Sequence, residues 1–251
     1  MELADIIKER VSTRSFMGAP LSTEHAALLE SLEKTFEKCR LVAINGVDGH
    51  VGTYGVVKGA AAAIAVICAD DEASTLMRAG YEGEKAVLRL TEAGLGTCWL
   101  GGTFRHTSVS RKAKCKGDEF PVAVIVIGYI AEKRRLLDKL MVKMVHSRSR
   151  KNFDELFKGA KEYLHKYEKS LELLRLAPSA RNAQPWRAVA DSRGVHFYYA
   201  DNGRFAPLDM GIGLCHFLLA EGCGFDRVTT DEFMSEAKDG NVYAGSVLFP
   251  A

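Results

Sequence analysis

The sequence predicts an α+β fold in which helices flank a mixed, partly antiparallel sheet. Apolar runs rich in β-branched and aromatic residues recur along the chain, and the helical segments between them do not alternate strictly with these runs. Strict alternation would instead favour a doubly wound parallel sheet. With 251 residues, of which 47% are hydrophobic, the chain can bury one large core or two modest ones. Five strands are expected, at 60–68, 120–129, 186–190, 195–199 and 242–249.

Helices are expected before and between these strands. Amphipathic patterns predict a short helix that starts near residue 2, a second at 22–38 and a third at 71–93. A fourth helix, at 161–176, has apolar residues at helical spacing, and Pro178 ends it because proline lacks a backbone N–H. A fifth helix carries the glycine at 211.

A weak internal repeat indicates that the chain contains two related halves. Gly83 and Gly94 recur 128 residues later as Gly211 and Gly222, and in each window small residues line a narrow seam along a helix. Small side chains let another backbone approach closely, so we expect the two helices to pack against each other about a pseudo-twofold axis. The repeat therefore predicts a pseudo-dimer within one chain.

The composition argues against several classes of function. A net charge of +2 with 26% charged residues shows no overall bias toward nucleic acid or an anionic membrane. The six cysteines form no C-x-x-C pair and are interpreted as free thiols in a reducing cytosol, the seven histidines are scattered, and no metal site is expected. The N-terminus lacks an apolar signal region, and no apolar run could span a bilayer, so we expect a cytoplasmic protein.

The run A-P-S-A-R-N-A-Q-P-W at 177–186 is the most informative motif of the chain. It lies between the fourth helix and a strand, and it places a hydroxyl and two carboxamides on one polar turn, from Ser179, Asn182 and Gln184. Carboxamides both donate and accept hydrogen bonds, which suits a heteroaromatic ring that carries both kinds of group. The alternative interpretation is an ordinary helix end followed by a surface turn.

Two further elements are candidates for the same site. The sequence R-V-S-T-R at 10–14 places two arginines and a hydroxyl at alternate positions of an extended stretch, where they can meet a phosphate dianion and an electron-rich ring edge. A solvated arginine pair at a helix end is the alternative. In the sequence G-L-G-T-C-W-L-G-G-T-F at 94–104, Gly101 and Gly102 let the backbone approach a flat ligand. A buried strand between glycine turns would look similar.

These three elements resemble the A-P-S-x-x-N-x-Q-P-W, R-x-S-x-R and G-L-G-x-x-x-L-G-G-F signatures of the nitroreductase family of FMN-dependent oxidoreductases. The resemblance implies a nitroreductase-like fold and an FMN site. Members of the family often end their catalytic unit with basic residues that reach the FMN phosphate, and a basic stretch before residue 153 offers two such side chains. The implied cofactor-binding residues are Arg10, Ser12, Arg14, Leu100, Gly101, Gly102, Arg148, Arg150, Pro178, Ser179, Ala180, Asn182 and Gln184.

The signatures are divided unequally along the chain. The half at 1–157 carries the arginine element and the glycine loop, but it reads C-R-L-V-A-I at 39–44 where the A-P-S turn would be expected. The half at 158–251 is shorter and carries that turn without an R-x-S-x-R element. Because typical nitroreductases are homodimers that build two flavin sites from both subunits, the resemblance implies a fused-dimer branch with one composite FMN site per chain. The internal dimer interface favours a monomer.

The resemblance also implies an activity. Electrons would pass from NAD(P)H through FMN to a small organic acceptor, such as a nitroaromatic or a quinone, in a ping-pong hydride mechanism. No side chain need act as a nucleophile, and Arg14 would give electrostatic support beside the flavin N1 and C2 carbonyl. One alternative is a non-catalytic protein that stores or senses FMN. Another is a different flavin reaction, such as dehalogenation, ring oxidation or flavin breakdown. The acceptor and the choice between NADH and NADPH stay open.

Overall fold

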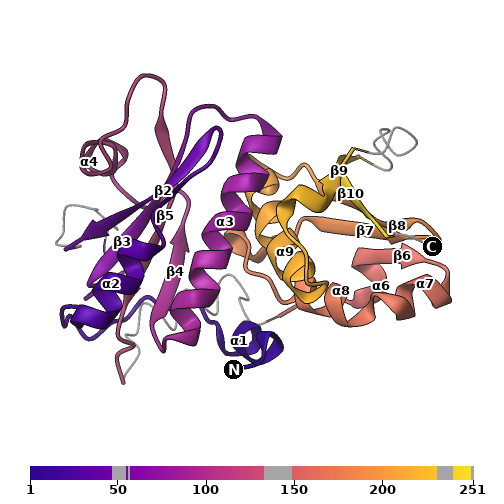
Figure 1. The fold of residues 1–251 in the computed structure, drawn as a ribbon, viewed down its shortest axis with the longest axis horizontal. Coiled ribbons are helices and arrows are strands. Elements are labelled where there is room, and N and C mark those ends of the chain that lie inside the picture. Colours follow the sequence, from indigo (N-terminus) through magenta and orange to yellow (C-terminus); the bar gives the residue numbers. More distant parts are fainter. Residues whose placement is uncertain (47–54, 56, 133–148, 231–239, 250–251) are drawn as a thin grey trace. The chain divides into compact units, whose positions relative to one another are not determined.

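The structure, a computed structural model, describes residues 1–46, 55, 57–132, 149–230 and 240–249. These residues form two compact units, each built around a five-stranded sheet (Figure 1). The first unit lies within 1–75 and 82–147, and the second within 76–81 and 148–251. The division into family halves at residue 157 is a different kind of boundary and stays a prediction.

In the sheet of the first unit the strands follow the order β1-β2-β3-β5-β4, and all neighbouring pairs are antiparallel. The elements of this part of the chain are α1 (Leu3–Glu9), α2 (Thr23–Ser31), β1 (Lys34–Thr35), β2 (Cys39–Asn45), β3 (Ala62–Cys68), α3 (Ala73–Glu92), β4 (Gly96–Leu100), α4 (His106–Lys112) and β5 (Phe120–Gly128). All seven residues of the central strand β3 are buried, which explains why its sequence is a continuous apolar run.

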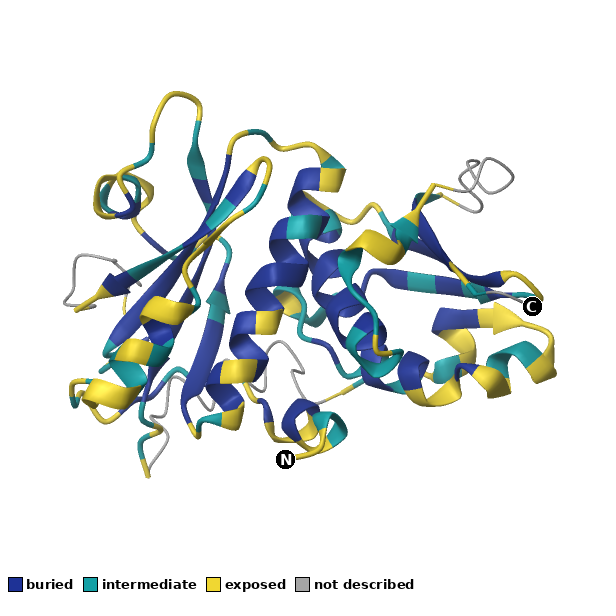
Figure 2. Ribbon diagram, viewed as in Figure 1, coloured by how far each residue is buried: buried dark blue, intermediate teal, exposed yellow. Residues whose placement is uncertain are grey.

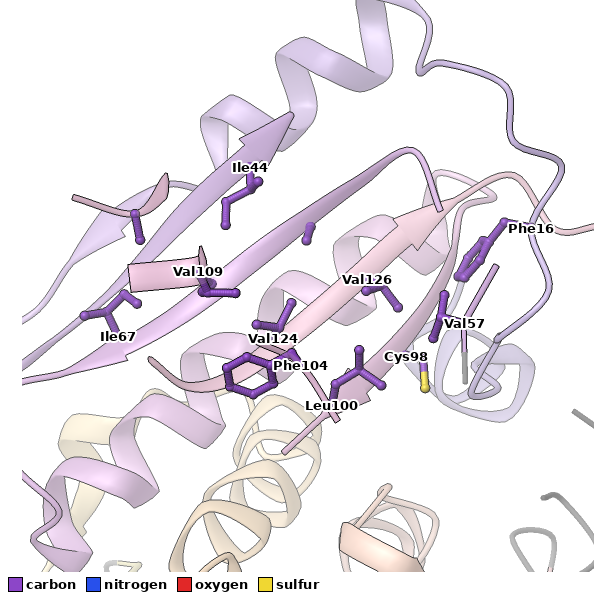
Figure 3. Close-up of a cluster of buried hydrophobic side chains, with 13 residues drawn as sticks. Phe16, Ile44, Val57, Ile67, Cys98, Leu100, Phe104, Val109, Val124 and Val126 are labelled. Carbon is purple, nitrogen blue, oxygen red and sulfur yellow. The ribbon is translucent and has the colours of Figure 1, made fainter. Parts of the chain in front are cut away.

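The core of the first unit occupies both faces of its sheet. Val124 and Val126 of β5 belong to an apolar cluster on one face, where Val109 of α4 joins them (Figure 3). The residue between them, Ile125, points to the other face, toward Gly83 of α3. The sheet is therefore buried between helices, as expected for this fold class.

The second unit contains a sheet with the order β6-β7-β8-β10-β9, in which the β6–β7 pair is parallel and the other pairs are antiparallel. Its elements are α6 (Phe153–Leu156), β6 (Phe157–Gly159), α7 (Lys161–Lys166), α8 (Glu168–Arg175), the 3-10 helix η1 (Ala180–Asn182), β7 (Trp186–Ala190), β8 (Gly194–Ala200), α9 (Ala206–Ala220), the 3-10 helix η2 (Phe225–Arg227), β9 (Val228–Thr229) and β10 (Asn241–Leu248). Most of α9 is buried (Figure 2), and Phe217 of this helix contacts Phe197 of β8 edge to face at 4.9 Å between ring centroids.

The two sheets share one strand order, although their first pairs differ in direction, antiparallel for β1–β2 and parallel for β6–β7. In each unit the fourth and fifth strands along the chain exchange places at one edge, and a long helix, α3 or α9, connects the third strand to the fourth. The glycine repeat thus falls on equivalent helices. This arrangement confirms the expected α+β fold and agrees with a pseudo-dimer of two fused halves.

The two long helices approach each other closely, but not at the expected pair of glycines. A Cβ on Gly211 would collide with the backbone of Met77, and a Cβ on Gly80 would collide with a backbone carbonyl of α9. Residues 76–81 of α3 therefore belong with α9 in the second unit. Gly83 has a different partner, because the indole ring of Trp99 covers it.

Several element bounds differ from the prediction. All five expected strands are present as β3, β5, β7, β8 and β10, and the described residues contain five more that were not among them: β1, β2, β4, β6 and β9. The helix expected at 22–38 ends at Ser31, because the chain turns and β1 pairs with β2. The helix expected at 161–176 breaks at Tyr167, whose ring is buried against Phe249 and Phe217. Within the described residues, no helix combines the length and the apolar character needed to cross a membrane.

Candidate functional site

The A-P-S-A-R-N-A-Q-P-W motif forms a strained turn between α8 and β7. Arg181, Asn182 and Gln184 all adopt left-handed backbone conformations, with φ values of 52°, 57° and 49°. Residues with a Cβ avoid this region, and such strain persists only where surrounding contacts enforce it. Two hydrogen bonds within the turn help to enforce these conformations. The backbone N–H of Gln184 donates to Ser179 Oγ at 2.9 Å, and the backbone N–H of Asn182 donates to the Ser179 carbonyl at 3.0 Å.

A second segment, residues 149–151, fastens the two carboxamides of the turn. Arg150 Nη1 donates to Asn182 Oδ1 at 3.2 Å, and Asn182 Nδ2 donates to the Ser149 carbonyl at 3.1 Å. The backbone N–H of Lys151 donates to Gln184 Oε1 at 2.9 Å. These two carboxamides were expected to contact a ligand ring, and in the structure they stabilise the conformation of the turn. The orientation of the backbone N–H and C=O groups of the turn is therefore fixed.

Arg150 spans the start and the middle of this turn. Besides Asn182, its guanidinium reaches the Leu176 carbonyl through Nη2 at 3.0 Å. An arginine near a helix C-terminus commonly satisfies such a carbonyl, which has no partner within the helix. The structure thus shows Arg150 as a brace of the turn.

Asp209 fastens the turn from a third direction. This residue lies near the start of α9 and is only 4% exposed, and the backbone N–H of Ala180 donates to its carboxyl group, with N···O distances of 3.1 and 2.9 Å to the two oxygens. Burial raises the pKa of Asp209 to about 8, and the Ala180 N–H offsets part of that shift. The sequence analysis did not single out Asp209, although an acidic residue in an apolar helix was a visible signal.

In the first unit, Arg10 is buried beside a carboxylate. Arg10 Nε lies 3.7 Å from Oε1 of Glu84, a fully buried residue of α3, and Glu84 Oε2 accepts from Trp99 Nε1 at 2.8 Å. Because a buried charge is costly without a partner, Glu84 and Arg10 stabilise each other. Sequence reasoning missed Glu84, whose signal was an acidic residue directly after Gly83 of the seam.

The stretch after Arg10 is extended, as expected. Ser12 forms a parallel bridge with Thr97 of β4, and Ser15 forms one with Lys58. Thr13 and Ser15 are buried, whereas Ser12 and Arg14 are half-buried. This alternation places Ser12 and Arg14 on the same, more accessible side of the stretch.

The glycine loop follows β4, the strand that Ser12 contacts. Leu100 ends this strand and is buried in the apolar cluster with Phe104, whereas Gly101 is half-buried and Gly102 is exposed. The loop therefore presents backbone without side chains directly after a buried strand. The segment contains the strand of the alternative interpretation, and the approach of a flat ligand to the accessible glycine pair stays a prediction.

The structure thus gathers the predicted residues into two groups, one in each unit. Ser12, Arg14, Leu100, Gly101 and Gly102 belong to the first group, with Arg10 directed to Glu84. Pro178, Ser179, Ala180, Asn182, Gln184 and Arg150 form the second group. Arg148 lies outside the described residues. In the described part of the chain, no group of three or more His, Cys, Asp or Glu side chains could hold a metal ion.

Comparisons with known proteins identify the family. Residues 2–221 match a family model described as "Putative TM nitroreductase". A "putative nitroreductase" from Thermotoga maritima MSB8 has 23% sequence identity and a TM-score of 0.65, with 100% of this chain and 95% of that chain covered. No curated protein matches.

Shorter nitroreductases match about half of the chain. A nitroreductase family protein from Clostridium difficile 630 is 17% identical with a TM-score of 0.45, and covers 55% of this chain and 90% of its own. An FMN-dependent nitroreductase from Clostridium difficile R20291 is 16% identical with a TM-score of 0.41, and covers 52% of this chain and 88% of its own. Because the family model spans most of its sequence, the chain belongs to the nitroreductase family.

Proposed function

We propose that this oxidoreductase binds FMN and transfers electrons from NAD(P)H to a small organic acceptor, such as a nitroaromatic or a quinone, in a ping-pong scheme. The strained turn at 177–186 is the observation that carries the proposal. Left-handed conformations at residues with a Cβ cluster at ligand-binding sites, and here three of them fall within the motif that resembles the family's flavin loop. When bound, FMN would supply the hydride chemistry, and the protein would supply binding, orientation and charge.

The chain's residues fit such a cofactor in chemical character. A guanidinium and a hydroxyl, from Arg14 and Ser12, lie on the accessible side of one extended stretch, and suit a phosphate or an electron-rich ring edge. Gly101 and Gly102 leave room for a flat ring to approach the backbone. We place Arg14 ahead of Arg10 as a contact, because Arg14 is half-buried whereas Arg10 is buried beside Glu84.

Arg14 would act through electrostatics. A cation near the flavin N1 and C2 carbonyl stabilises the negative charge that reduction places there, which raises the reduction potential and speeds hydride transfer. The turn would contribute backbone groups held in fixed positions by Arg150 and Asp209. No protein nucleophile is required.

Flavin stoichiometry and reduction test the proposal. The purified protein is incubated with excess FMN and desalted, flavin per chain is measured, and NADH or NADPH is then added without oxygen. We expect one flavin per chain, bleaching by a reduced nicotinamide, and return of the colour when a quinone is added. Two flavins per chain would contradict one FMN site per chain, and bound flavin that does not bleach would favour storage or sensing of FMN.

A matched pair of variants separates the role of Arg14 from general charge. Arg14→Ala should retain the fold and slow flavin reduction. Arg111→Ala removes an exposed arginine of α4 in the same unit and should leave the reduction rate unchanged. Equal rates in the wild type and both variants would remove Arg14 from this role.

A further inference from the structure

The buried carboxyl of Asp209 reaches across the second unit to the motif turn. Asp209 and Ala180 are 29 residues apart in sequence, yet both carboxyl oxygens lie within hydrogen-bond distance of the Ala180 N–H, at 3.1 and 2.9 Å. Twelve residues of α9, most of them apolar, are buried. A carboxyl in such surroundings is unfavourable unless it is hydrogen-bonded, so its placement calls for an explanation.

The bonded N–H stands at the point where the turn leaves ordinary backbone geometry. Ser179 is still extended, with φ −146° and ψ 159°, whereas Arg181 and Asn182 are left-handed. Asp209 therefore fixes the residue between the two conformations. From the other side, Arg150 and Lys151 hold Asn182 and Gln184, so that the strained part is fastened at both ends.

We propose that Asp209 is a positioning residue for the flavin turn, whose carboxyl keeps the Ala180 N–H in place and so preorganises Ser179–Gln184 for the ligand. This inference rests on the proposed function for its ligand, but not for the contact itself. Preorganisation favours binding because the turn need not lose conformational freedom when the ligand arrives. Loss of the carboxyl leaves a partly buried N–H without its acceptor and releases the turn.

Three variants separate positioning from general stability. Asp209→Ala removes the acceptor, whereas Asp209→Asn keeps an oxygen of the same reach. The control is His216→Gln on the same helix, because His216 is also fully buried and its Nδ1 is hydrogen-bonded to the Leu173 carbonyl at 2.9 Å, away from the turn. A merely structural role would make the Asp209→Ala and His216→Gln variants alike.

The first measurement is amide hydrogen exchange of the peptide spanning 177–185 in the flavin-free protein. Asp209→Ala should raise exchange there by about tenfold, Asp209→Asn should restore most of the protection, and His216→Gln should leave this peptide unchanged. Unchanged exchange in Asp209→Ala, or an equal increase in His216→Gln, would overturn the inference.

The second measurement is FMN affinity by fluorescence titration. We expect the Kd of Asp209→Ala to rise about tenfold, with Asp209→Asn close to the wild type. An unchanged Kd in Asp209→Ala would refute the positioning role even if exchange had increased. Absence of FMN binding by the wild type would instead refute the proposed function, and the exchange data would still decide whether Asp209 orders the turn.

Discussion

The pH dependence of stability should carry a signature of Asp209. The folded protein keeps the proton of this carboxyl up to about pH 8, whereas an unfolded aspartate releases it near 3.8. Between these values the folded state binds one more proton, so the free energy of unfolding falls as pH rises. One proton gives a slope of at most about 1.4 kcal/mol per pH unit. Asp209→Asn has no proton to release and should lack this contribution.

The assay is urea unfolding of the flavin-free wild type and Asp209→Asn across a pH series. Other groups titrate in the same range, so the informative quantity is the difference in unfolding free energy between the two proteins. We expect the wild type to lose stability relative to the variant as pH rises from about 5 to about 7. Parallel pH profiles would show that Asp209 ionises normally, and would refute the reasoning from its burial.

Three further outcomes follow from particular contacts. Gly211→Ala places a Cβ against a backbone carbonyl of α3 and should lower the unfolding free energy of the second unit by about 3 kcal/mol or more. In the control Gly213→Ala the nearest atoms to the new Cβ belong to side chains, so the loss of stability should be smaller. Equal urea midpoints for the two variants would contradict the close approach of the backbones. In stopped-flow mixing with reduced nicotinamide, Arg14→Ala should reduce bound flavin more slowly than the wild type. Burial raises the pKa of Cys68 to about 12, so mass spectrometry should find Cys68 unalkylated after iodoacetamide treatment of the folded protein. Faster alkylation of Cys68 than of the half-buried Cys223 would contradict this expectation.

Sequence patterns predicted those parts of the fold that local residues decide. The continuous apolar runs of β3 and β5 marked strands directly, since burial on both faces removes polar positions. The short run of β7 showed the alternation of a strand with one buried face. The strand β4 was harder to recognise because glycines border it on both sides. The early end of α2 at Ser31 depends on pairing between β1 and β2, which is a tertiary effect that local propensity does not contain.

The candidate site shows the same limit. The motif correctly placed Ser179, Asn182 and Gln184 on one turn, because a turn is local in sequence. Their hydrogen bonds to residues 149–151 are not local, so sequence patterns could assign Arg150 and the carboxamides to one site but could not predict that they contact one another directly. The same holds for Asp209, whose relation to Ala180 depends on how α9 packs.

The helix α3 has a consequence for how the chain can be divided. Its residues 76–81 belong to the second unit, although in sequence they lie between the two segments of the first unit, and Gly211 packs against Met77 there. A fragment that begins at residue 148 would therefore lack a piece of its own core. The complementary fragment, 1–147, would keep residues 76–81 of α3 without the α9 residues against which they pack.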